Sequence, residues 1–141
     1  MSVQAVTHLN FQGQARAALA FYQQVFGGQL MQFTYRDAGR TANEADLDLI
    51  VWGQVEAPNG FRIMAFDVAS DKPWHHGENA FYVSLRGDTQ EEIQALWDKL
   101  VDGAAIVQGL APSSWSPMYG MVKDRFGIAW VVDVVEHARV A

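Results

Sequence analysis

The feature that most constrains the fold of this chain is a strand–helix pattern that occurs twice. In each copy, apolar residues recur at i, i+3, i+4, i+7 and i+8 of a predicted helix, and glycine ends the helix. The two helices align at one constant offset through Ala18/Ile93, Phe21/Leu96, Tyr22/Trp97, Val25/Leu100, Phe26/Val101 and Gly28/Gly103. A second similarity lies downstream, where the segment Gly127-Ile128…Asp133-Val134 resembles Gly60-Phe61…Asp67-Val68. The alternative is a coincidence of two ordinary amphipathic helices, but the shared strand order favours an internal repeat.

Strand-like segments fill the rest of both copies. Alternating apolar residues and turn residues predict strands at 3–11, 30–36, 47–55 and 61–68, and again at 80–86, 105–110, 114–123 and 127–135. Residues 37–44 and 69–78 are predicted to be loops, and Thr89 with Glu92 forms a capping box before the second helix. The order predicts an α+β chain made of two βαβββ modules, about 1–70 and 78–137.

The C-terminal part of the chain carries a more specific motif. Aromatic-rich, strand-like runs flank a polar turn at 123–125, which predicts a hairpin. The motif reads Trp115…Tyr119-Gly120…Asp124-Arg125-Phe126-Gly127-Ile128…Trp130. It resembles the C-terminal signature of the PhnB-like branch of the vicinal-oxygen-chelate (glyoxalase/bleomycin resistance/dioxygenase) superfamily. Segments 18–28 and 61–67 extend the resemblance over nearly the whole chain.

The resemblance implies a fold and an assembly. We expect one glyoxalase-like domain over residues 1–141, in which the two βαβββ modules form a curved mixed sheet around a cavity. The resemblance also implies a homodimer, because modules of the family often pair across subunits.

Composition excludes several partners. A formal charge of −6 without a basic cluster argues against nucleic acid, which requires phosphate-neutralising Lys and Arg. No apolar run approaches the ~20 residues of a membrane span, and no secretory signal pattern opens the chain. The absence of cysteine removes disulfides, thiolate zinc sites and cysteine nucleophiles. We therefore expect a soluble, cytoplasmic protein that binds neither nucleic acid nor membrane.

The metal positions of the superfamily map poorly onto this chain. Metal-dependent members place His or Glu on the first and last strands of each module, and such ligands suit first-row divalent metals. By resemblance these positions fall on or near His8, Met64, Tyr82 and Val131. Two of the four are apolar, so we expect no metal and no other cofactor, with one divalent ion as the alternative. Some relatives carry a methyltransferase label, but no glycine-rich dinucleotide turn follows a strand here.

His8 is the best candidate for a catalytic residue. It lies on the strand face opposite Leu9 and Phe11, which is expected to line the cavity, and imidazole titrates near neutral pH. The alternative is a histidine whose hydrogen bonds are satisfied by a neighbour or by water. Three further polar residues are expected on matching strand faces as ligand-binding residues: Asn10, Tyr82 and Ser84.

Aromatic and sulfur-bearing side chains complete the predicted ligand pocket. They are Trp52, Met64, Trp115 and Tyr119, although most such residues in proteins are simply core. His75 and His76 are adjacent, and adjacent residues of an extended chain point apart, so a loop or lid beside the cavity is favoured over a metal site.

The sequence is compatible with three functions. The leading hypothesis is a PhnB-like protein that binds a small organic ligand in a metal-free cavity as a homodimer. The second is a metal-dependent lyase, isomerase or dioxygenase-type enzyme with a displaced site containing His8 and His75 or His76. The third is a drug-sequestering module of the resistance-protein type, which would bind hydrophobic compounds without turnover.

Overall fold

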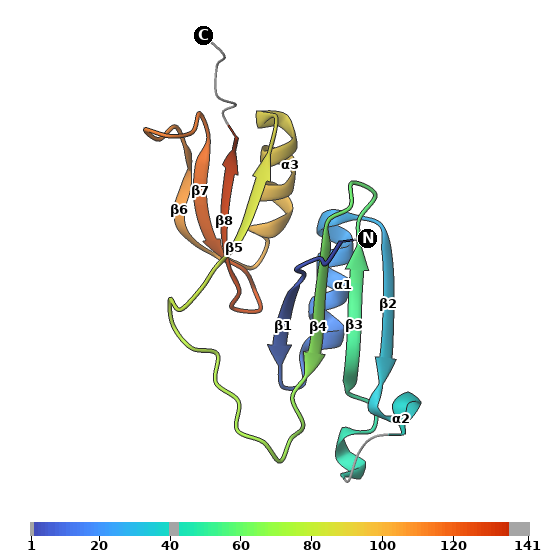
Figure 1. Cartoon of the computed structure of the whole chain (residues 1–141). Coiled ribbons are helices and arrows are strands. Elements are labelled where there is room, and N and C mark those ends of the chain that lie inside the picture. The colour runs from blue at the N-terminus through green and yellow to red at the C-terminus, as the bar shows by residue number, and fades with distance from the viewer. Residues whose placement is uncertain (1, 40–42, 136–141) are drawn as a thin grey trace. The chain divides into compact units, whose positions relative to one another are not determined.

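A computed structural model describes residues 2–39 and 43–135 of the chain. The chain divides into two compact units, Met1–His76 and Gly77–Ala141, and each unit contains its own sheet (Figure 1). The prediction of an α+β fold with two βαβββ modules is confirmed; that they constitute one domain stays a prediction. The end of the predicted second module, 136–137, and residues 40–42 of a predicted loop lie outside the described residues. None of the described helices has the length and apolar character of a membrane span.

The first unit follows the predicted order with two short additions. Its elements are β1 (Thr7–Phe11), α1 (Ala15–Phe26), β2 (Gln29–Thr34), α2 (Tyr35–Ala38), the 3-10 helix η1 (Glu44–Asp46), β3 (Ile50–Glu56) and β4 (Arg62–Asp67). The sheet order is β1-β4-β3-β2, with β1 parallel to β4 and the other pairs antiparallel. A crossover helix joins β1 to the rest, as a parallel pair requires.

Helix α1 covers one face of this sheet. Its stripe of buried side chains includes Ala18, Leu19 and Tyr22, none of which is exposed to solvent. The helix packs mainly against β3 and β4, and a Cβ at Gly53 would lie 2.3 Å from the Leu19 Cδ1 atom, so a larger residue there would displace the Leu19 side chain. The core of the first unit therefore lies between α1 and the sheet.

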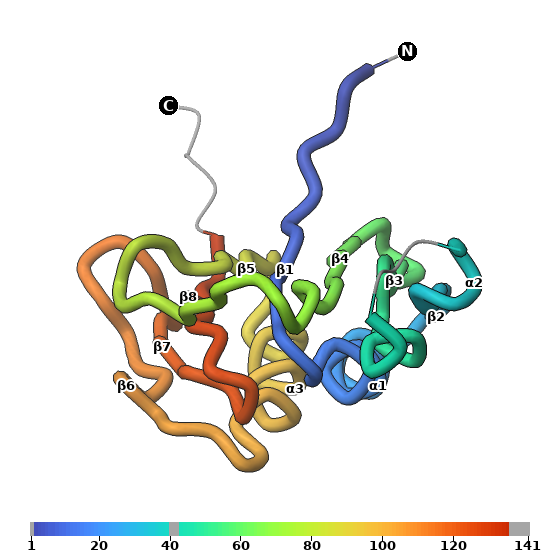
Figure 2. Tube along the Cα trace, turned by 90° about the horizontal axis from the view of Figure 1, so that it is seen from below, coloured from blue at the N-terminus to red at the C-terminus, as the bar shows by residue number. Residues whose placement is uncertain are grey.

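The second unit repeats the arrangement. It consists of β5 (Val83–Gly87), α3 (Gln90–Leu100), β6 (Ala105–Ala111), β7 (Tyr119–Lys123) and β8 (Ala129–Val134). The sheet order is β5-β8-β7-β6, again with one parallel pair, β5–β8. Thr89 caps α3, because its side chain accepts a hydrogen bond from the Glu92 N–H at 3.2 Å. Only this half of the predicted capping box is present, since the Glu92 carboxylate accepts from the Thr89 hydroxyl at 3.0 Å rather than from the Thr89 backbone N–H. In Figure 2 each long helix lies on one side of its own sheet.

The signature motif at 124–130 forms the turn between β7 and β8. Asp124 is 4% exposed, and its Oδ1 atom accepts hydrogen bonds from the N–H groups of Phe126 and Ile128. Its Oδ2 atom accepts from the indole Nε1–H of Trp130 at 2.8 Å. The most specific part of the motif thus stabilises a hairpin turn, because it satisfies donors that burial removes from water.

Several strands are shorter than predicted. The first strand begins at Thr7 rather than Val3, and the fifth begins at Val83 rather than Ala80. Residues 114–118 of the predicted seventh strand instead form an irregular, bent segment before β7, and the Ser116 side chain donates to the Val134 carbonyl at 2.7 Å. Pro117 lacks the N–H that a ladder requires, which accounts for this difference.

The predicted loop at 37–44 begins as a helix. Thr34 caps α2 with a reciprocal capping box, in which its side chain accepts from the Asp37 N–H and Asp37 accepts from the Thr34 N–H. The predicted second strand therefore ends at Thr34 instead of Arg36.

Candidate functional site

Each sheet has one face turned away from its helix, which we call its open face. On the first sheet, Leu9, Ile63 and Val55 are buried on the side of α1. The alternating residues occupy the first open face, which carries His8 and Asn10 of β1, Met64 and Phe66 of β4, Trp52 of β3 and Phe33 of β2. The side chains predicted to bind ligand in this unit, His8, Asn10, Trp52 and Met64, thus share one face.

Aromatic and sulfur atoms are concentrated on the first open face. The Trp52 indole Nε1–H donates a hydrogen bond to the Met64 sulfur at 3.2 Å. The rings of Phe33 and Trp52 are stacked with their centroids 6.2 Å apart and their planes 22° apart. Phe33 is 46% exposed, so this apolar group is accessible from the open side.

His8 is exposed at the β1 edge of this face. Its Nδ1 atom lies 2.8 Å from the Asn10 Oδ1 atom, and its ring meets the edge of Phe66 with centroids 5.1 Å apart. When Nδ1 carries the proton and donates to Asn10, Nε2 has a lone pair that accepts a proton or a hydrogen bond. Asn10 therefore orients the imidazole, which is compatible with the predicted acid–base role.

The second open face is more polar. It carries Ser84 and Arg86 of β5, Val131 and Asp133 of β8, and Tyr119 and Met121 of β7. Arg86 Nε and Asp133 Oδ1 form an ion pair at 3.2 Å, and the ring of Trp115 meets Tyr119 edge-on with centroids 5.1 Å apart. The predicted ligand-binding residues Ser84, Trp115 and Tyr119 belong to this face or its rim.

Tyr82 lies outside the strand to which we assigned it. It precedes β5, and its hydroxyl donates a hydrogen bond to the Asn79 Oδ1 atom at 2.6 Å. Strand register instead places Ser84 opposite Val131, just as His8 stands opposite Met64 in the first sheet. The residue equivalent to His8 in the second module is therefore Ser84.

The superfamily's four metal positions, with Ser84 in place of Tyr82, do not carry the side chains of a divalent-metal site. His8 supplies one imidazole, Ser84 one hydroxyl and Met64 one thioether that already accepts a hydrogen bond from Trp52, whereas Val131 supplies no donor atom. Within residues 2–39 and 43–135 no three His, Asp or Glu side chains gather into a group able to hold a metal ion. First-row divalent metals are usually held by carboxylate and imidazole ligands, and these four positions supply only one such ligand, His8.

The adjacent histidines His75 and His76 are both exposed, and the His76 ring packs edge-on against Trp74 with centroids 5.4 Å apart. The Trp74 indole donates a hydrogen bond to the Asn10 carbonyl at 3.0 Å. Gln12 also ties this loop to the unit, because its side-chain amide donates to the carbonyls of Ala69 and Lys72. The loop is therefore anchored beside β1.

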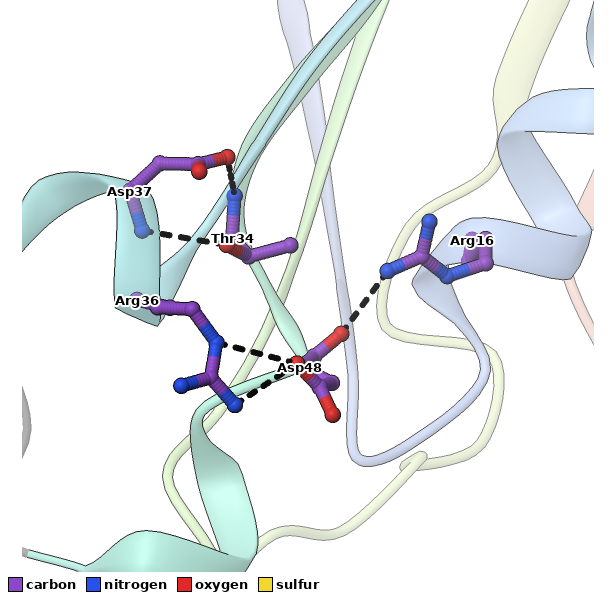
Figure 3. Close-up of polar contacts among 5 residues, drawn as sticks. All are labelled: Arg16, Thr34, Arg36, Asp37 and Asp48. Carbon is purple, nitrogen blue, oxygen red and sulfur yellow. Dashed lines mark hydrogen bonds and ion pairs between the residues drawn. The ribbon is translucent and has the colours of Figure 1, made fainter.

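A polar cluster connects the end of β2 with the N-terminus of α1 (Figure 3). Arg36 pairs with the Asp48 carboxylate at 3.2 Å, and Arg16 donates to the Asp48 carbonyl at 2.8 Å. The pKa of Asp37 is lowered from 3.8, first because the Thr34 N–H donates to its carboxylate and then because the Thr34 side chain does. These contacts fix local structure, since each carboxylate already has protein partners.

The sequence analysis did not select five residues that lie on these two faces: Phe33, Phe66, Arg86, Met121 and Asp133. Phe33 and Arg86 were detectable as members of alternating strand segments. The face on which Asp133 lies was not detectable, because the sequence repeat aligns Asp133 with Asp67 and this alignment is wrong by one residue. Asp67 pairs with Phe11 and lies on the helix side of its sheet, whereas Asp133 pairs with Arg86 and lies on the open side.

Two four-stranded mixed sheets, each with βαβββ order, define the fold of the glyoxalase/bleomycin resistance/dioxygenase superfamily, and solved structures of that superfamily match it. A sequence model of the family described as 3-demethylubiquinone-9 3-methyltransferase matches residues 3–133. The chain belongs to this family, and the predicted resemblance to its PhnB-like members is confirmed.

Three relatives illustrate the match. The crystal structure of protein PA1353 from Pseudomonas aeruginosa is 31% identical, with a TM-score of 0.82, over 96% of this chain and 100% of that one. The PhnB protein from Bacillus cereus is 22% identical with a TM-score of 0.71, over 94% and 100% of the two chains. Protein YjdN of Escherichia coli K12 is 23% identical over 137 residues, which are 92% of this chain and 93% of YjdN.

Proposed function

We propose that this protein binds a small, flat and largely apolar organic ligand on the first open face, as a homodimer and without a metal ion at the superfamily's ligand positions. The observation that carries this proposal is the accessible aromatic–sulfur group of Phe33, Trp52 and Met64. Ligand sites are predominantly apolar with a few placed polar groups. His8, oriented by Asn10, supplies such a group at the edge of the face.

The geometry of this group favours a planar ligand. The hydrogen bond to Met64 holds the Trp52 ring in place, so little side-chain entropy is lost when a ring stacks on it. Aromatic pairs contribute about 0.5–1.5 kcal/mol beyond the area that they bury. A ligand with a polar substituent near its ring would also reach His8.

Thermal unfolding with 1-naphthol as an uncharged aromatic probe tests the proposal. A ligand that binds only the folded protein raises its Tm. We expect 1-naphthol to raise the Tm of the wild-type protein and of Trp115→Leu, which removes an exposed tryptophan of the other unit. The increase should be lost in Trp52→Leu. An equal increase in all three proteins would show that the first open face is not the binding site.

We propose the β6 edge as the place where two subunits associate. Among the strands of residues 2–39 and 43–135, β6 pairs only with β7. It contains no charged residue and exposes Ile106 at 56% and Val107 at 62%. Soluble proteins usually protect such edges with charges or cover them. Light scattering should give twice the subunit mass of 15.7 kDa, and Val107→Lys should give the monomer. A monomeric wild-type protein would refute the dimer, and a dimeric variant would refute this interface.

The metal-dependent alternative makes a different prediction. Mass spectrometry of protein purified without chelator or affinity tag would then find about one divalent ion per subunit, lost on His8→Ala. Our proposal expects no stoichiometric metal, including after incubation with zinc, nickel or manganese.

A further inference from the structure

The two open faces differ at equivalent positions. In the first sheet, the residue pair that follows His8 and Met64 along β1 and β4 is Asn10–Phe66, which is neutral and partly aromatic. In the second sheet, the pair that follows Ser84 and Val131 is Arg86–Asp133, which is charged. The second unit thus has the cation Arg86 at the position where the first unit has the amide Asn10.

The Asp133 carboxylate holds the Arg86 side chain in one orientation. Asp133 is only 6% exposed, and its Oδ1 atom accepts from Arg86 Nε at 3.2 Å. Removing water from a carboxylate strengthens its attraction to a neighbouring cation. The Arg86 side chain remains 57% exposed, so its outer part is accessible to solvent.

The bond to Asp133 leaves the ends of the guanidinium available. In the part of the chain that the structure describes, Arg86 bonds through Nε, and no hydrogen bond engages either of its Nη atoms. A guanidinium presents paired N–H donors that match the two oxygens of a carboxylate, and such paired bonds are stronger than neutral ones. Arg125 of the same unit differs, because its Nη2 atom is bound to the Asp102 carboxylate at 3.0 Å.

An aromatic surface adjoins this cation. Tyr119 of β7 stands opposite Asp133 of β8, on the other side of Asp133 from Arg86. The ring of Trp115 meets Tyr119 edge-on, and Trp115 is 60% exposed. A small ligand bound to Arg86 therefore has aromatic side chains within the same row of the sheet.

We propose that the second open face binds the carboxylate group of a small aromatic acid, with Arg86 as the anion-binding residue, Asp133 as the residue that positions Arg86, and Tyr119 with Trp115 beside the ring of the ligand. The site lies within the second unit and does not rest on ligand binding by the first open face. Because the chain has a formal charge of −6, most of its surface repels organic anions, whereas the exposed Arg86 guanidinium attracts them.

Benzoate and benzamide are matched probes, since they share ring and shape but only benzoate is charged. Heteronuclear NMR reports the Arg86 Nε–H and the Trp115 indole N–H separately. We expect benzoate to shift both signals saturably and benzamide to bind at least about tenfold more weakly. Arg86→Gln should weaken benzoate binding at least about tenfold, whereas the matched variant Arg125→Gln should leave it unchanged.

Several results would overturn this assignment. They are the absence of a saturable benzoate shift, equal affinity for the two probes, and equal shifts at Arg86 and Arg125, which would indicate unspecific attraction.

Arg86→Lys provides a second test if Arg86→Gln fails to fold, because it keeps a cation beside Asp133 but has no paired donors. Arg86→Lys should bind benzoate more weakly than the wild type, and undiminished binding would refute the role of the guanidinium. Binding of 1-naphthol should not change in either variant, which separates this site from the first open face.

Discussion

Asp67 is expected to be the most important buried carboxylate for the stability of the first unit. It is 1% exposed, and its Oδ1 atom accepts from the N–H groups of Gly13 at 2.8 Å and Ala15 at 3.0 Å. Its Oδ2 atom accepts from the Ile50 N–H at 3.0 Å. The N-cap residue of α1, Gln14, makes no side-chain cap, so Asp67 takes over that role from β4 and also fixes the start of β3.

The cost of substitution follows from these bonds. A buried N–H left without an acceptor costs about 1–3 kcal/mol. Asp67→Ala removes the acceptor of two buried N–H groups, Ala15 and Ile50, and should therefore destabilise the protein by about 2–6 kcal/mol. Asp67→Asn keeps one oxygen and places an amide group near one N–H, so its cost should be about half as large, roughly 1–3 kcal/mol.

Urea unfolding followed by tryptophan fluorescence measures both changes as shifts of the midpoint at constant m-value. The matched control is Asp71→Asn, an exposed aspartate of the same unit, which should change the unfolding free energy by no more than about 0.5 kcal/mol. If Asp67→Ala costs no more than this control, the assignment of Asp67 as the cap of α1 is wrong.

Three further substitutions test local structure. Gly28→Ala should destabilise more than Gly27→Ala in urea unfolding, because both have positive φ but only at Gly28 would a Cβ lie 2.0 Å from a backbone oxygen. Because the pKa of Asp37 is lowered from 3.8 by the Thr34 N–H, its ionised form stabilises the fold above pH 3.8, and this contribution is lost as pH falls through the folded-state pKa. Asp37→Asn should therefore be less stable than the wild type near neutral pH but not in acid; a difference that persists in acid would contradict this. Trp130→Phe should cost about 1–3 kcal/mol in the same assay, because a buried carboxylate loses its indole donor.

The fold was largely predictable from periodicity. The two apolar stripes and the glycines that follow them identify α1 and α3, because a helix that packs on one sheet buries one side only. The hairpin of β3 and β4 was also predictable from the turn residues at 57–60. The first residues of the strands were not predictable. For example, the apolar alternation of Phe81, Val83 and Leu85 begins two residues before β5 starts to pair with β8 at Val83.

The candidate sites were only partly predictable. Alternation along β1 identifies His8 and Asn10 as neighbours on one face, and the structure confirms their contact. The ion pair of Arg86 with Asp133 joins residues 47 positions apart, and it depends on the register of β5 against β8. Single-sequence patterns carry no information on register between distant strands, so the repeat alone suggested a wrong equivalence between Asp67 and Asp133.

The measurement that tests the central proposal most directly is an NMR titration of the protein with 1-naphthol, in which each tryptophan indole N–H is observed. Ligand binding on the first open face predicts that the Trp52 signal moves first and saturates, because its N–H bonds to Met64 within the proposed contact surface. The buried Trp130 signal, bonded to Asp124, should stay in place. A titration that shifts other tryptophans and leaves Trp52 unchanged would contradict the proposal.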